Sequence, residues 1–375
     1  MSAESITPLT MPKWGLSMKE GKLLSWLINE GDSFNKGDEI AEVETEKIAS
    51  AVEAPLSGTL RKIVTEDDTV YSVGALLGVV ADESVSDEDI NAFAEKFQAE
   101  FVPEEDDDEE EASASEFIQI NDLNIRYVSK GEGDDVVILI HGFGGDLDNW
   151  LFNHDELVSK SGKRVIAIDL PGHGQTTKSA GDGSFVFFAD IIHEFIKSLN
   201  INKVHLIGHS MGGAVSLQFA EKYPDVTLSL GLICSAGLGD EINSEYINGF
   251  VESSSRKQVK PYLQQLFANK DLVTRQLINN ILQYKRLDGV DSVLKTIVDS
   301  FLADGKQQLK FNDLLDSFSG SVCVIWGSQD QIIPVQHAEN LPANTKVLKV
   351  ETAGHMVQME AANQVNAFLI ESNLT

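Results

Sequence analysis

The sequence predicts a multidomain protein, with a small all-β domain at the N-terminus and a larger α/β domain after it. The first ~80 residues contain an internal repeat of short strands and glycine turns, whereas apolar strands alternate with helical segments after residue 117. The acidic run 104–111 stands between the two patterns. Because like charges repel one another and do not pack, we expect this run to be a solvated linker. The expected parts are therefore 1–82, 83–116 and 117–375.

The N-terminal repeat predicts two similar four-stranded sheets, stacked as a flattened sandwich or barrel. The two halves begin with strands at Gly21 and Gly58, and each continues through an acidic turn to a second glycine and another strand. Between the halves, strands at 40–44 and 49–54 are expected to flank a tight hairpin. Lys47 would then lie at the tip of this central hairpin.

The rest of the chain predicts a helix, a linker and a mostly parallel sheet. Apolar residues recur at three- and four-residue steps over 86–101, which indicates one amphipathic helix before the acidic run. Between 240 and 311 the strands stop and helical spacing replaces them, and we interpret 240–312 as a helical cap over the carboxyl edge of the sheet. The strands of the sheet are expected at 136–140, 164–168, 204–208, 228–234, 322–326 and 346–350.

Composition narrows the function classes. A formal net charge of -30 argues against nucleic acid as the main partner, because phosphate binding needs a basic surface. Cys234 and Cys323 each lie in an apolar stretch, so we interpret them as buried thiols rather than as a redox pair or metal ligands. The histidines show no metal-ligand spacing, and no metal is expected. Without a charged leader or a membrane-length apolar stretch, the chain is expected to be cytoplasmic and not membrane-bound.

Lys47 is a candidate attachment site for a mobile cofactor. A lysine is usually just a solvated charge. At the tip of the central hairpin of a pseudo-symmetric β-domain, however, it would be held away from the domain and presented to a modifying enzyme.

The first ~80 residues contain a series of short motifs, which are Met11-Pro12-Lys13, Met18-Lys19-Glu20-Gly21, Glu30-Gly31-Asp32, Gly37-Asp38, Glu44-Thr45-Glu46-Lys47, Glu53-Ala54-Pro55 and Gly58. In these motifs the first ~80 residues resemble the lipoyl domain family. Biotinyl domains usually carry methionine on both sides of the modified lysine, whereas Glu46 and Ile48 flank Lys47 here. The resemblance therefore implies lipoate, attached covalently to Lys47, rather than biotin.

Ser210 is a candidate nucleophile. It is the central residue of Gly208-His209-Ser210-Met211-Gly212, which follows an apolar strand and precedes a helical stretch, as a strained turn that exposes a serine hydroxyl requires. Such a serine needs a base, and the base needs an orienting carboxylate. Asp330 and His355 each follow an expected strand, so both are placed at the carboxyl edge of the sheet with Ser210. Alternatively, Asp330 caps a turn and His355 is a surface residue.

The chain from about residue 117 onward resembles the α/β-hydrolase superfamily, in which the order serine, acid, histidine is the one found here. The loop His141-Gly142-Phe143-Gly144-Gly145 resembles the oxyanion loop of that family. The resemblance implies that the backbone N–H groups of Phe143 and Met211 stabilise an oxyanion. Asp169 and His173, in a second loop common in the family, are expected to form a turn rather than to catalyse.

The combination of the two domains resembles the family of dihydrolipoamide acetyltransferase components of acetoin dehydrogenase complexes. The resemblance implies transfer of an acetyl group from the lipoyl arm to coenzyme A. It also implies two partner enzymes, a thiamine-diphosphate-dependent dehydrogenase component and dihydrolipoamide dehydrogenase. Two alternatives remain: a serine hydrolase or thioesterase with the same triad, and a carrier and scaffold whose second domain only docks partners.

The phosphates of coenzyme A would need a locally basic surface on this acidic chain. The expected cap is close to neutral in charge, and it contains a cluster of Arg256, Lys257 and Lys260. Lys285 and Arg286 form a second basic pair. The alternative is that these side chains are ordinary solvated helix faces.

Overall fold

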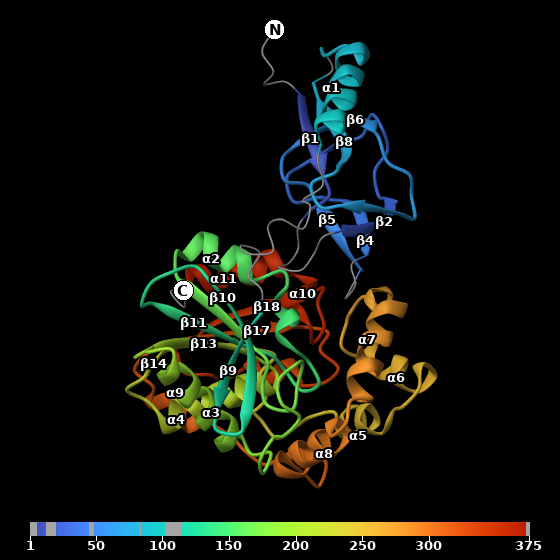
Figure 1. Cartoon of the computed structure of the whole chain (residues 1–375). Coiled ribbons are helices and arrows are strands. Elements are labelled where there is room, and N and C mark those ends of the chain that lie inside the picture. The colour runs from blue at the N-terminus through green and yellow to red at the C-terminus, as the bar shows by residue number, and fades with distance from the viewer. Residues whose placement is uncertain (1–5, 13–19, 45–48, 83, 102–114, 373–375) are drawn as a thin grey trace. The chain divides into compact units, whose positions relative to one another are not determined.

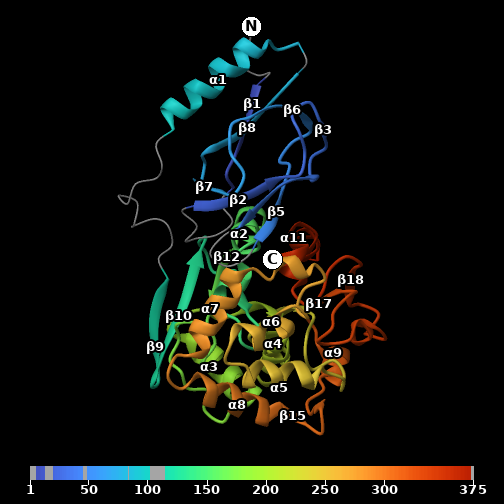
Figure 2. The same ribbon diagram turned by 90° about the vertical axis from the view of Figure 1, so that its right-hand side faces the viewer.

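The computed structural model of the chain is shown in two orientations in Figures 1 and 2. It describes residues 6–12, 20–44, 49–82, 84–101 and 115–372. The chain forms two compact units, which consist mainly of residues 1–112 and 113–375. Within the described ranges, none of the helices combines the length and the apolar character needed to span a bilayer.

The N-terminal unit contains the two four-stranded sheets that the repeat predicted. Leu23 and Val43 from one sheet and Leu60 from the other are fully buried in a common apolar core. The first sheet contains β1 (Ile6–Thr10), β8 (Leu76–Ala81), β6 (Gly58–Ile63) and β3 (Ser33–Phe34), and the second contains β5 (Ala49–Glu53), β4 (Glu39–Glu44), β2 (Glu20–Trp26) and β7 (Thr69–Ser72).

The predicted helix is α1 (Asp87–Glu100), and it packs against β8. Its buried residues Ile90 and Ala94 form a cluster with Val79 of that strand. The helix begins where Ser86 accepts a hydrogen bond from the N–H of Asp89 at 3.1 Å, an N-cap that stabilises the first turn.

The central hairpin is formed by β4 and β5. These strands pair antiparallel, and their last register pair joins Glu44 to Ala49. Residues 45–48, and Lys47 among them, connect these paired ends and lie outside the described residues.

The second unit contains an eight-stranded sheet in the order β18-β17-β14-β13-β11-β12-β10-β9. In this order every neighbouring pair from β18 as far as β12 is parallel. At the other edge β10 pairs antiparallel with β12, and β9 pairs antiparallel with β10. The strands are β9 (Glu116–Ile120), β10 (Leu123–Lys130), β11 (Val136–Ile140), β12 (Arg164–Ile168), β13 (Val204–His209), β14 (Thr227–Ile233), β17 (Ser321–Gly327) and β18 (Lys346–Val350).

The six predicted strands of this sheet are present, with ends that differ by no more than one residue. The sequence did not predict β9 and β10. The reason is that β9 is mostly exposed at the edge of the sheet and β10 is only partly buried, so neither strand has a continuous apolar run.

Helices cover both faces of this sheet, as Figure 1 shows. On one face α3 packs against α4, and on the other α2 packs against α11. Their bounds are α2 (His154–Ser161), α3 (Phe185–Ser198), α4 (Met211–Lys222) and α11 (Ala362–Glu371), and the short α10 (Val357–Glu360) precedes α11.

The cap leaves the sheet after β14 and returns before β17. Its two ends lie side by side, because the N–H of Gln307 donates to the carbonyl of Asp240 and the N–H of Phe311 donates to that of Gly237, both at 2.9 Å. The cap contains α5 (Ser244–Glu252), α6 (Arg256–Leu263), the 3-10 turn η4 (Lys270–Leu272), α7 (Arg275–Lys285) and α8 (Val290–Phe301), and α9 (Asn312–Ser317) follows it.

The prediction that strands stop between residues 240 and 311 was wrong. The two-residue strands β15 (Leu302–Ala303) and β16 (Lys306–Gln307) form a hairpin there. Two residues are too few to give a period-two pattern in the sequence.

Burial disfavours the charged form of five histidines of the second unit. In each of them desolvation is the largest effect, and it lowers the pKa below the ordinary histidine value. These residues are His141, His154, His173, His205 and His209.

We therefore expect the second unit to lose stability as the pH falls below about 6.5, the pKa of histidine in an unfolded chain. The unfolded chain binds protons on these imidazoles at that pH, whereas the folded chain binds them only at a lower pH, so the free energy of unfolding decreases. At about pH 5.5 each histidine lowers the free energy of unfolding by at most about 1.4 kcal/mol. Calorimetric melting at about pH 7.5 and 5.5 measures the effect.

The matched variant for this measurement is His154→Gln. Nε2 of His154 contacts the carbonyl of Val165 at 2.9 Å, and a glutamine amide keeps a donor there without a group that titrates. The variant should show a smaller loss of melting temperature on acidification, and an unchanged loss would contradict the explanation.

Candidate active site

Ser210 sits in a strained turn between β13 and α4. Its φ of 53° and ψ of -117° lie in a region that residues other than glycine rarely adopt. The turn is fixed from strand β14, because the N–H of Ser210 donates to the carbonyl of Ile233 at 2.9 Å and its own carbonyl accepts from the N–H of Ala236 at 3.0 Å. The serine is therefore held at the carboxyl edge of the sheet, at the start of a helix.

The glycines on either side of Ser210 permit close backbone contacts. A Cβ atom at Gly208 would lie 2.2 Å from the carbonyl oxygen of Gly212, and a Cβ atom at Gly212 would lie 2.2 Å from that of Ile140. Any side chain at these positions would displace backbone. The spacing of glycines that marked Ser210 in the sequence is thus a packing requirement of the turn.

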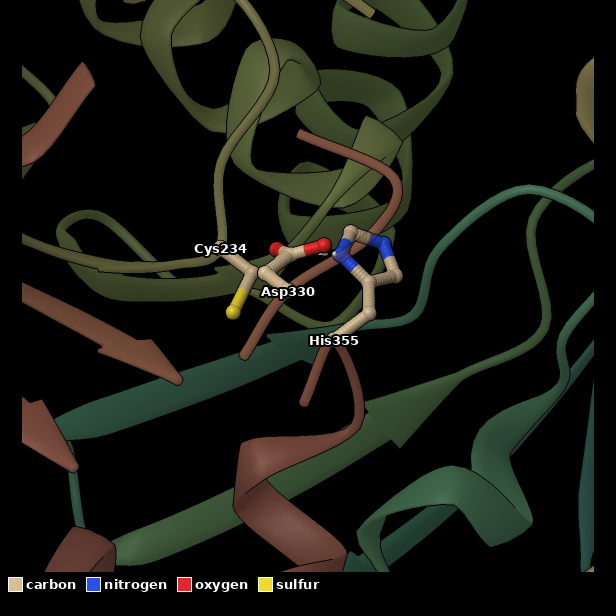
Figure 3. A group of neighbouring side chains, drawn as sticks. All are labelled: Cys234, Asp330 and His355. Carbon is tan, nitrogen blue, oxygen red and sulfur yellow. Dashed lines mark hydrogen bonds and ion pairs between the residues drawn. The ribbon is translucent and has the colours of Figure 1, made fainter. Parts of the chain in front are cut away.

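Asp330 and His355 form a buried hydrogen-bonded pair in the loops after β17 and β18. Nδ1 of His355 lies 2.7 Å from Oδ2 of Asp330, and the two side chains are 3% and 0% exposed. Figure 3 shows the imidazole ring and the carboxylate facing each other. Oδ1 of Asp330 accepts from the N–H groups of Ile332 at 2.7 Å and Ile333 at 3.0 Å. The carboxylate is therefore fixed, and it orients the imidazole so that Nε2 is left for chemistry.

His209 brings the loop of His355 next to Ser210. Nε2 of His209 donates to the carbonyl of His355 at 2.9 Å, and the two imidazole centroids are 4.8 Å apart. In the described part of the chain, Oγ of Ser210 makes no hydrogen bond to His355. Catalytic hydrogen bonds are often long before substrate binds. The structure thus brings the three predicted residues to one edge of the sheet.

The loop after β11 lies against the serine. A Cβ atom at Gly142 would be 3.1 Å from Cβ of Ser210, so the backbone of this loop contacts the nucleophile directly. Among the described residues, the N–H groups of Phe143 and Met211 donate to no protein acceptor. Neither group thus has a described protein acceptor that would compete with an oxyanion, and their role as oxyanion donors stays a prediction.

Asp169 holds the neighbouring loop together. Its buried carboxylate accepts from the N–H groups of Leu147 at 2.7 Å and Gln175 at 2.8 Å, and it lies 3.4 Å from the guanidinium of Arg126. Burial, aided by the charge of Asp146, raises the pKa of Asp169 more than Arg126 lowers it. The fully buried side chain serves the turn, as the sequence indicated.

Cys234 is a neighbour of the pair that the sequence did not place there. Its Sγ, a carboxylate oxygen of Asp330 and a ring nitrogen of His355 all lie within 4.8 Å of one another, a spacing that could hold a metal ion. Burial and the charge of Asp330 raise the pKa of the Cys234 thiol well above its ordinary value, so it is not the thiolate that metals bind. The arrangement therefore favours a hydrogen-bonded acid and histidine over a metal centre.

The basic residues of the cap differ in exposure. Arg256, Lys257 and Lys260 are exposed on α6, and Nε of Arg256 donates to Oδ1 of Asn279 at 2.7 Å. Lys285 is buried instead, and its ammonium donates to the carbonyls of Phe250 and Val251 at the end of α5. The interpretation of Lys285 and Arg286 as a surface pair for phosphate was wrong for Lys285, whose buried ammonium donates within the cap.

Family models match both units of the chain. The model described as the alpha/beta hydrolase fold matches residues 135–362, and the model described as biotin-requiring enzyme matches residues 7–80. A solved structure of a meta-cleavage product hydrolase from Pseudomonas fluorescens superposes with a TM-score of 0.62 over 68% of this chain and 96% of that chain, at 22% identity. That likeness shows the fold of the second unit.

Two relatives match the chain over almost its whole length. The dihydrolipoyllysine-residue acetyltransferase component of the acetoin cleaving system of Pseudomonas putida is 46% identical, over 96% of this chain and 96% of its own length. The protein of the same description from Cupriavidus necator is 44% identical, over 97% of this chain and 96% of its own length. A turn that exposes Ser210 beside an oriented histidine, in a chain that also has a biotin- or lipoyl-attachment domain, agrees with that description. The chain belongs to the family of dihydrolipoyllysine-residue acetyltransferase components of acetoin cleaving systems.

Proposed function

We propose that this acyltransferase moves an acetyl group from a dihydrolipoyl-lysine to coenzyme A, with Ser210, His355 and Asp330 as its catalytic triad. The observation that carries the proposal is the buried His355 and Asp330 pair, 2.7 Å apart, beside the strained turn of Ser210. The relatives at 46% and 44% identity are named for this type of transfer.

We assign lipoate to Lys47. Members of the family carry lipoate covalently on a lysine, and bound lipoate supplies a thiol that accepts the acetyl group as a thioester. The described residues fit such an arm, because β4 and β5 are paired as far as Glu44 and Ala49, the two residues that flank 45–48 in the chain. A lysine in that connection is the natural point for attachment.

The triad accounts for the transfer in two steps. In the first, Nε2 of His355 takes the proton of the Ser210 hydroxyl as Oγ attacks the acyl carbon, and the N–H groups of Phe143 and Met211 stabilise the oxyanion. His355 then returns the proton to the departing thiol, which leaves the acetyl group on Ser210. In the second step His355 takes the proton of the coenzyme A thiol, the sulfur attacks the acyl carbon of acetyl-serine, and His355 returns the proton to the released Oγ of Ser210. Direct transfer without acetyl-serine is the alternative course.

Water in place of coenzyme A would make the same site a hydrolase or thioesterase, so the choice between the two acceptors defines the function. An assay that offers acetyl-dihydrolipoamide with coenzyme A in water should form acetyl-coenzyme A in excess over free acetate. Acetate as the main product, with coenzyme A unreacted, would favour the hydrolase instead.

The acetoin cleaving system has further components, and two of them follow from the chemistry. A thiamine-diphosphate-dependent dehydrogenase component would supply the acetyl group to the oxidised lipoyl arm. Dihydrolipoamide dehydrogenase would reoxidise the dithiol that remains after transfer. Both are proposed as partners of this chain.

The exposed residues Arg256, Lys257 and Lys260 of α6 are the proposed contact for the phosphates of coenzyme A. Replacing all three with glutamine should raise the KM for coenzyme A and leave kcat nearly unchanged, because a distant phosphate contact affects binding more than the reacting bond. The KM of the unmodified enzyme should also rise with salt, since screening acts over about 8 Å at physiological ionic strength. Steady-state kinetics at two salt concentrations test both points, and an unchanged KM would place the phosphates elsewhere.

A further inference from the structure

Glu360 joins the cap to the loop that carries His355. It is the last residue of α10, and Oε1 of its carboxylate accepts from the N–H groups of Ala268 at 2.8 Å and Asn269 at 3.2 Å in the cap. Oε2 accepts from the N–H of Gly354, next to His355, at 2.7 Å. One carboxylate therefore contacts both segments through their backbones.

The two segments also touch each other on both sides of the histidine. The N–H of Met356 donates to the carbonyl of Leu266 at 3.0 Å. At Gly354 a Cβ atom would lie 2.7 Å from the backbone nitrogen of Ala268 and 3.0 Å from the carbonyl oxygen of Leu266, so only glycine permits this approach. Both chain neighbours of His355 are thus in contact with the cap segment 266–269.

Within the described residues, no lysine or arginine forms an ion pair with Glu360. Burial raises the pKa of Glu360 and the negative charge of Asp330 raises it further, while the three amide donors lower it. The carboxylate is held by N–H groups alone, whose number and direction suit a group with two acceptor oxygens. An amide of the same size would turn an NH₂ group toward one of the N–H donors.

We propose that Glu360 is a positioning residue that fixes the imidazole of His355 relative to the cap. The imidazole then faces Ser210 only while segment 266–269 of the cap is hydrogen-bonded to Glu360. The proposal rests on the proposed function of the triad. The cap would then be part of the catalytic site. It would exclude water from the site, and its segment 266–269 would also orient the catalytic base, His355.

The first variant for the test is Glu360→Gln, which keeps the size of the side chain and loses one of the two acceptors. We expect kcat for acetyl transfer to fall about 10- to 100-fold, the loss that a misplacement of roughly 1 Å produces, while the KM for coenzyme A stays within about twofold. The rate at which a fluorophosphonate labels Ser210 should fall by a similar factor. Gly354→Ala, which separates the two segments without changing a charge, should give the same pattern.

The matched control is Asp135→Asn, which removes a carboxylate that pairs with Lys163 and His205 at the far end of the sheet. It should lower the melting temperature and leave the labelling rate unchanged. If Glu360→Gln or Gly354→Ala behaves like this control, Glu360 is only structural and the proposal is overturned. If Glu360→Gln does not fold, Gly354→Ala decides alone.

Fluorophosphonate labelling needs no acyl acceptor, so it separates the two hypotheses. Labelling that depends on Glu360 in an enzyme that forms no acetyl-coenzyme A would support the positioning role and overturn only the proposed acceptor. An unmodified enzyme whose Ser210 resists the probe would overturn the triad, and the role of Glu360 with it.

Discussion

Replacing Ser210 with alanine is expected to lower the rate of acetyl transfer to coenzyme A by at least about 10⁴-fold, because the variant has no nucleophile for His355 to activate. The melting temperature should change little, since the serine side chain makes no hydrogen bond to the residues that the structure describes. The backbone N–H and carbonyl of Ser210 hold the turn instead. Formation of acetyl-coenzyme A from acetyl-dihydrolipoamide measures the loss.

Variants of the partners show whether the three residues act as one unit. His355→Ala and Asp330→Asn should each lose several orders of magnitude, and the double variant of Ser210 and His355 should lose little more than the worse single one. Additive losses would argue against a triad. Ser198→Ala is a control with an exposed serine on α3, whose hydroxyl donates only to the carbonyl of Glu194, and it should keep full activity.

Replacing Lys47 with arginine should abolish transfer of acetyl groups that arrive from the partner dehydrogenase component. The guanidinium group is not a nucleophile that can be joined to lipoate, so the arm is lost while the charge is kept. Free acetyl-dihydrolipoamide should still react at nearly the normal rate, because it bypasses the arm and Ser210 is unchanged. Intact mass, peptide mapping and the two assays together measure these outcomes.

Lys36→Arg is the control for this variant, since Lys36 is exposed in the same unit and its backbone N–H bonds to Ser57 whatever its side chain is. It should keep both lipoate and transfer. Lipoate found on another lysine, or undiminished transfer after Lys47→Arg, would show that the arm is attached elsewhere.

The sequence predicted most of the sheet because its central strands are buried on both faces and read as continuous apolar runs. It also placed Ser210, Asp330 and His355 together, because residues at the carboxyl ends of parallel strands meet at one edge. The edge strand β9 and the hairpin of β15 and β16 have no such pattern, since one is largely exposed and the others are very short.

Other parts of the site depend on contacts that no local pattern encodes. Glu360 accepts from the amide of Ala268, which is distant in the sequence, as well as from that of nearby Gly354, and no local pattern signals the distant contact. Lys285 is followed by Arg286 and is typical of a surface cation by its sequence, yet it is buried and donates to carbonyls at the end of α5. Such roles follow from tertiary structure and cannot be deduced from spacing.

The adjacent ends of the cap make it an exchangeable module. The backbones of Asp240 and Gln307, and those of Gly237 and Phe311, are joined by hydrogen bonds, so the chain enters and leaves the cap at one place. The strands of the sheet pair with one another without any residue of the cap. A different cap could therefore be joined at this place, by evolution or by design, and could change the acyl acceptor without a change in the sheet. Such a cap would have to present two backbone N–H groups to Glu360 where Ala268 and Asn269 now present theirs, and a backbone carbonyl to Met356 where Leu266 now does.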